Sequence, residues 1–107
     1  MKLAIVLSTK QAETNWNAFR LGNLALRKGD AVSVFLVGEA VEYLSTSNEK
    51  FDVGKQVDTF LKSANAKIIA CGTCLTIRNQ KESRECPAGG IEDLYGLIIN
   101  SDKVITF

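Results

Sequence analysis

Two cysteines three positions apart, Cys71 and Cys74, are the most reactive feature of the sequence, in the segment CGTC. The apolar residues from Lys67 to Cys71 predict a buried strand, and the residues from Thr73 to about Arg78 predict a helix. A sulfur between a strand and a helix faces unpaired backbone N–H groups and the positive end of the helix dipole, which favour the thiolate. Because the thiolate is the nucleophilic form of cysteine, the pattern predicts a reactive sulfur at Cys71.

Three further residues complete the candidate site. Arg78 lies four residues beyond Cys74, on the same predicted helix face, where its charge would favour a thiolate. Cys86 follows in a loop beside Pro87, and Thr73 lies between the two cysteines. We take Cys71 and Cys74 as candidate catalytic residues and Arg78, Thr73 and Cys86 as candidate substrate-binding residues. The alternative is that the cysteines only pack, because cysteine is among the most frequently buried residues.

The absence of histidine removes several chemistries at once. It excludes serine–histidine triads, cysteine–histidine pairs, and zinc or haem held by histidine. Structural zinc needs four ligands, and the sequence has three cysteines, so we expect no metal and no cofactor. A thioredoxin-like enzyme would place a proline before a late strand, whereas Pro87 precedes a predicted helix. Sulfur transfer and dithiol exchange both remain open.

The composition limits the classes of partner and the cellular compartments that we expect. Thirteen basic and twelve acidic residues leave a formal charge of +1, which removes the electrostatic argument for nucleic acid or a membrane surface. No apolar stretch approaches the roughly 20 residues of a membrane helix, and the apolar run Leu3 to Leu7 is too short for a signal peptide. We therefore expect a cytoplasmic protein, where cysteines stay reduced.

The remaining pattern predicts one α/β domain over residues 1–107, with a parallel sheet between two helical layers. Ligands of such sheets bind beyond the carboxyl ends of the strands, here just after Leu7, Val37 and Cys71. The loop 45–52 is expected to be mobile. The expected strands are 2–7, 31–37, 67–71 and 103–107, and the expected helices are 13–28, 38–44, 53–64, 73–78 and 91–98.

Four segments of the sequence resemble the DsrE/DsrF-like family, which includes the TusD-type sulfur-relay subunits. They are LAIVLST, KIIACGTCLTIR, CPAGGIEDL and SDKVITF. The resemblance implies a flavodoxin-like three-layer domain that assembles into trimers or hexamers. It also implies that the persulfide-carrying cysteine is Cys71 and that donor and acceptor proteins exchange sulfur with it.

The resulting hypothesis is a cytoplasmic, sulfurtransferase-like carrier of sulfane sulfur. Cys71 is the acceptor thiolate, Cys74 the resolving thiol, and Arg78 the electrostatic support. Two alternatives are an oligomeric, non-catalytic module that binds a small ligand, and a CxxC thiol-disulfide oxidoreductase. Oligomerisation is also expected from the aromatic residues, which suggest more apolar surface than one thin sheet can cover: Trp16, Phe35, Phe60 and Phe107.

Overall fold

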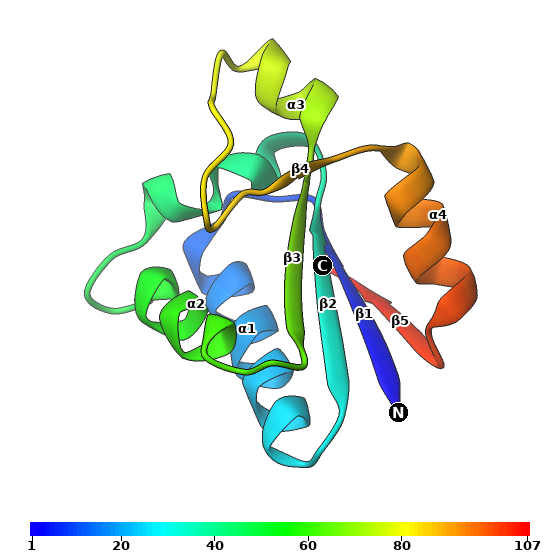
Figure 1. Ribbon diagram of the computed structural model, residues 1–107. Coiled ribbons are helices and arrows are strands. Elements are labelled where there is room, and N and C mark those ends of the chain that lie inside the picture. Colours follow the sequence, from blue (N-terminus) through cyan, green and yellow to red (C-terminus); the bar gives the residue numbers. More distant parts are fainter.

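The computed structural model describes residues 1–107 and contains one sheet of five parallel strands (Figure 1). Along the sheet the strands lie in the order β4-β3-β2-β1-β5, and every neighbouring pair is parallel. Such pairing requires a crossover between successive strands, which the helices supply. The strands are β1 (Lys2–Leu7), β2 (Ala31–Leu36), β3 (Ala66–Cys71), β4 (Ala88–Gly89) and β5 (Lys103–Thr106).

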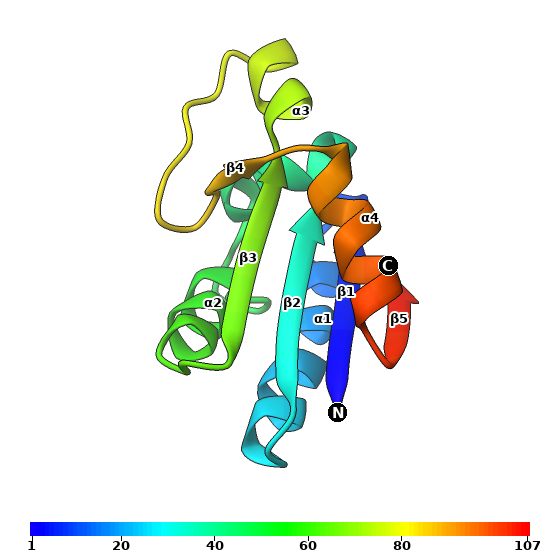
Figure 2. The same cartoon turned by 45° about the vertical axis from the view of Figure 1, so that its right-hand side comes forward.

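Helices cover both faces of the sheet, which confirms the predicted three-layer α/β architecture. The pair α1 and α2 lies on one face and α4 on the other, as the two views show (Figures 1 and 2). No helix of the structure has both the length and the apolar character needed to cross a membrane. The helices are α1 (Ala12–Arg27), the 3-10 helix η1 (Gly38–Thr46), α2 (Val53–Leu61), α3 (Gly72–Ile77) and α4 (Ile91–Asn100).

The main core lies between the sheet and the pair α1 and α2. Alternate residues of β1, such as Leu3, Ile5 and Leu7, point into this layer and are fully or almost fully buried. Phe19 of α1 lies at its centre, stacked on Tyr43 and edge-on to Phe60 with ring centroids 5.7 and 5.3 Å apart. This packing anchors the first helix and η1 against the same sheet face.

The structure corrects two expectations. The sheet has a fifth strand, β4, in the loop that was expected around Cys86, so Pro87 precedes a strand and not a helix. The aromatic argument for oligomerisation was also wrong in its residues, because Phe35 and Phe60 are buried within the chain itself. Four of the eight exposed large apolar side chains lie on α4 instead, where Ile91, Tyr95, Ile98 and Ile99 are 72%, 56%, 48% and 63% exposed.

The carboxyl ends of β2 and β3 lie at the same edge of the sheet, and two short helices follow them directly. Gly38 begins η1 after β2, and Gly72 begins α3 after β3. Figure 1 shows α3 standing beyond this edge, at the top of the view. The edge is therefore where η1 and the CGTC segment meet.

Candidate functional site

Cys71 is held by two elements. It is the last residue of β3 and the residue that precedes α3, with extended backbone (φ −62°, ψ 114°). Its neighbour across the sheet is Gly89 of β4, and a side chain at Gly72 would come within 3.2 Å of the Gly89 carbonyl oxygen. The glycine inside the CGTC motif therefore lets β4 approach the motif backbone. Cys71 itself is half-buried.

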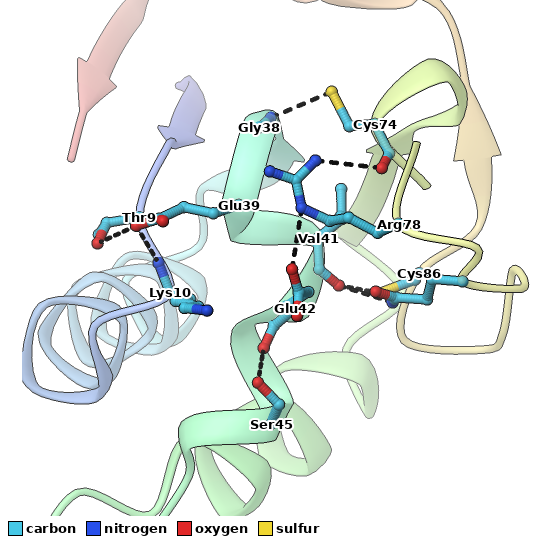
Figure 3. A network of polar contacts seen from close by, with 11 residues as sticks. Thr9, Lys10, Gly38, Glu39, Val41, Glu42, Ser45, Cys74, Arg78 and Cys86 are labelled. Carbon is cyan, nitrogen blue, oxygen red and sulfur yellow. Dashed lines mark hydrogen bonds and ion pairs between the residues drawn. The ribbon is translucent and has the colours of Figure 1, made fainter. Parts of the chain in front are cut away.

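Cys74 receives a hydrogen bond from a different element. Its Sγ accepts the backbone N–H of Gly38 at 3.2 Å, a contact between residues 36 positions apart (Figure 3). Gly38 has a positive φ of 61°, a conformation that glycine adopts without strain. The turn from β2 into η1 therefore presents an N–H group to the sulfur. Cys74 is half-buried, like Cys71.

Arg78 lies on the same side of α3 as Cys74, as the spacing predicted. Its Nη1 donates to the Cys74 carbonyl oxygen at 3.2 Å, and its Nε donates to Glu42 Oε1 of η1 at 2.9 Å (Figure 3). Both side chains of this ion pair are partly exposed, 28% for Arg78 and 34% for Glu42. The pair holds the guanidinium beside Cys74 and joins α3 to η1.

The electrostatics of the two sulfurs differ from the expectation. The pKa of Cys74 is lowered, chiefly because the Cys71 thiol donates a hydrogen bond to it, with further help from the Gly38 N–H and the Arg78 charge. The pKa of Cys71 is raised, first by burial and then because its proton is shared with Cys74. The expected preference of Cys71 for the thiolate is therefore opposed by its burial and by the neighbouring sulfur. The N–H groups of Thr73 and Cys74 do favour its thiolate, but burial and the neighbouring sulfur outweigh them.

The other two candidate residues take different places. Thr73 is exposed, and its backbone N–H rather than its side chain acts on the Cys71 sulfur. Cys86 is 2% exposed and belongs to the main core. Its Sγ donates to the Val41 carbonyl oxygen at 3.5 Å, and burial is the main cause that raises its pKa to about 11. The structure therefore places Cys86 in the core and not beside Cys71 and Cys74.

Residues of η1 form the part of the site that the sequence reasoning missed. Glu39 accepts from the Thr9 hydroxyl and the Lys10 N–H, both at 3.3 Å, so the connection after β1 also reaches this edge (Figure 3). Glu42 and Gly38 act on α3. The signal for Gly38 was its place directly after a parallel strand, at the same edge as the CGTC motif. The sequence position of Glu42 did not indicate that it belongs to the site.

The setting of the pair is open rather than enclosed. Five hollows of the surface have no lining residue from the CGTC motif. The nearest along η1 is a cavity of about 190 Å³ that Glu42 and Cys86 help to line. No cluster of three or more cysteine, aspartate or glutamate side chains is arranged to hold a metal ion. The arrangement suits exchange with a sulfur atom that approaches from outside.

Comparison with known proteins agrees with this architecture. A model of the DsrE/DsrF-like family matches residues 1–107. Among solved structures, the crystal structure of the ychN protein from E. coli superposes with a TM-score of 0.79 at 21% sequence identity, and the match covers 100% of both chains. At this identity the likeness shows the fold. No curated protein matches the chain.

Proposed function

The chain belongs to the DsrE/DsrF-like family, and from that premise we propose that it handles sulfane sulfur in a sulfur relay. In this proposal the sulfur is carried as a persulfide on Cys71. One observation supports it above the others: at the carboxyl edge of the sheet, three residues beyond Cys71, the Cys74 Sγ accepts the Gly38 N–H at 3.2 Å, and its surroundings favour the thiolate. A thiolate is what sulfur transfer needs as its attacking group.

The surroundings of Cys71 suit a persulfide. The backbone N–H groups of Thr73 and Cys74 both favour negative charge on the Cys71 sulfur, and a persulfide is such an anion. Cys71 is also half-buried, so an attached sulfur would have partial shelter from water. The protein is proposed to work in the cytoplasm, where a reducing environment keeps both thiols free.

The test of this function is mass spectrometry after exposure to glutathione persulfide. The wild type should gain about 32 Da for each sulfur acquired, and peptide mapping should place it on Cys71 at completion. The Cys71→Ser/Cys74→Ser double variant should gain none. Cys86→Ser is the matched control, since it also lacks a cysteine but should load like the wild type. Equal loading of the wild type and the double variant would remove the proposal.

The same proposal includes assembly with other chains. The exposed apolar residues of α4 recur at helical spacing, and monomeric proteins rarely expose large apolar patches of this kind. We expect copies of the chain to associate through α4, into the trimer or hexamer that the family resemblance implies, with separate donor and acceptor proteins at the cysteine edge. Light scattering should show a smaller particle for Ile98→Lys than for the wild type, and no change for Lys62→Glu on the opposite helical layer. A monomeric wild type contradicts this part.

A second candidate function is dithiol–disulfide exchange, favoured by the position of Cys71 and Cys74 within one turn at the start of α3. It predicts that mild oxidation removes two thiols per chain and that a dithiol reductant restores both. Loss of one thiol with cross-linked chains, or no loss, would exclude it.

A further inference from the structure

The hydrogen bond from Gly38 distinguishes the two sulfurs by geometry. A backbone N–H from a separate element reaches Cys74 Sγ at 3.2 Å. Building on the proposed function, we propose that Cys74 makes the first attack on the incoming sulfane sulfur and then passes that sulfur to Cys71. The entry residue and the carrying residue are thus different members of the CGTC pair.

Three groups from two elements converge on Cys74 and favour its thiolate. They are the Cys71 thiol, the Gly38 N–H and the Arg78 guanidinium. Figure 3 shows the Gly38 and Arg78 contacts, and Glu42 of η1 accepts from Arg78 Nε at 2.9 Å. Glu42 is a positioning residue, since its contact is to Arg78. Glu39, the other acid at this end of η1, is bonded to Thr9 and Lys10 instead. A backbone N–H fixed by the fold needs no reorganisation when charge develops or leaves the sulfur.

The sequence of bond changes is balanced without an added oxidant or reductant. In the first step the Cys74 thiolate attacks the outer sulfur of a donor persulfide, R–S–SH. A bond forms between Cys74 Sγ and that sulfur, the donor S–S bond breaks, and its electron pair leaves with the donor as R–S⁻. The proton on the outer sulfur stays in place, which gives Cys74–S–SH.

In the second step Cys71 attacks the same outer sulfur. The new bond joins that sulfur to Cys71, the bond to Cys74 breaks, and its electron pair restores the Cys74 thiolate. The Cys71 proton ends on the released R–S⁻, so the net change converts R–S–SH and a Cys71 thiol into R–SH and a Cys71 persulfide. Cys74 is then ready for a second donor, while the N–H groups of Thr73 and Cys74 favour negative charge on the Cys71 side.

Single variants separate the two roles. With glutathione persulfide at pH 7, Cys74→Ser should load several-fold more slowly than the wild type, because the remaining Cys71 thiol has a raised pKa and is mostly neutral there. Cys71→Ser should still load, faster than Cys74→Ser, with the added sulfur mapped to Cys74 and retained there. Both variants make the same substitution in the same motif, and circular dichroism should show that each is folded.

Each outcome of this comparison either supports or overturns the assignment of the first attack to Cys74. Fast loading of Cys74→Ser with none on Cys71→Ser overturns the assignment of entry to Cys74 and leaves the proposed function standing. Equal loss in both variants also overturns it. If the wild type itself gains no sulfur, the proposed function fails rather than the order of the two cysteines.

The dependence of loading on pH tests the electrostatic support. Removing the charge with Arg78→Gln should move the midpoint of the loading profile to higher pH, with the wild-type rate regained in alkaline solution. Arg78→Lys should restore much of the wild-type midpoint, because it keeps the charge. A purely structural role for Arg78 would lower the rate at every pH and leave the midpoint in place, which contradicts the role assigned to the guanidinium.

Discussion

The stability of the fold should decrease in alkaline solution because Cys86 is buried as a neutral thiol. Only 2% of the residue is exposed, and its Sγ donates to the Val41 carbonyl oxygen. Burial is the main cause that raises the pKa of Cys86 from its ordinary value of 9.0 to about 11, and the nearby charge of Glu85 adds to it. The proton is therefore held more tightly in the folded chain than in the unfolded one.

The sign and size of the effect follow from proton linkage. Below pH 9 both states hold the proton, so the full stability is present. Between pH 9 and about 11 the unfolded chain releases it while the folded chain keeps it, and the free energy of unfolding falls as the pH rises. Two pKa units correspond to about 2.7 kcal/mol, a substantial part of the 5–15 kcal/mol typical of a domain.

Urea unfolding at pH 8, 9, 10 and 11 in reducing buffer measures this loss. Cys86→Ser is the matched variant, because serine is of similar size and does not titrate in this range. Tyrosine and lysine groups titrate in both proteins, so the difference between the two curves isolates Cys86. The advantage of the wild type should shrink by about 2.3 kcal/mol from pH 8 to pH 11, because at pH 11 half of the folded chains have also lost the Cys86 proton. Parallel curves would refute the burial argument and place the Cys86 thiol in contact with solvent.

Two stability predictions concern residues of β4 and η1, the elements that pack beside the CGTC segment. Gly89→Ala should destabilise the fold by about 1–3 kcal/mol in urea unfolding, because the added Cβ would lie 2.4 Å from Ile69 Cγ2. Gly96→Ala, in open space on α4, should instead stabilise by about 0.5–1 kcal/mol, and equal effects would contradict the contact. Tyr43→Phe should cost about 1 kcal/mol, because the hydroxyl donates to the Glu85 carbonyl oxygen at 2.8 Å; an unchanged unfolding midpoint would count against that bond.

The sequence predicted the elements that have strong periodic patterns. The apolar run of β1, the sixteen-residue α1 and the position of Cys71 at the end of β3 were all predicted and are confirmed. The strand β4 was missed because it has two residues and one is Gly89. Its place is set by backbone pairing, including the Ala70 N–H bond to the Pro87 carbonyl oxygen at 2.8 Å. Backbone pairing leaves no trace in side-chain alternation.

The hydrogen bond that Gly38 donates to Cys74 could not be predicted either, because it too depends on the folded backbone. The helix-start argument considers only local backbone and correctly placed the N–H groups of Thr73 and Cys74 near Cys71. The contact that separates the two sulfurs comes from Gly38, 36 residues earlier in the chain. Local spacing carries no information on such a contact, because it exists only once β2 and β3 pair in register.

The short helix η1 connects the parts of this edge to one another. Gly38 donates to Cys74, Glu42 holds Arg78, and the Val41 carbonyl oxygen accepts from both Gln80 and Cys86. These contacts reach both α3 and the loop that follows it, so a displacement of η1 would change all of them together. Glu42 lies within a kink of η1, with φ −97° and ψ 18°. Because Ala40, Val41 and Tyr43 of η1 are buried and Gly38 at its start donates to Cys74, the hydrogen bonding of that sulfur and the placement of Arg78 depend on the same short segment.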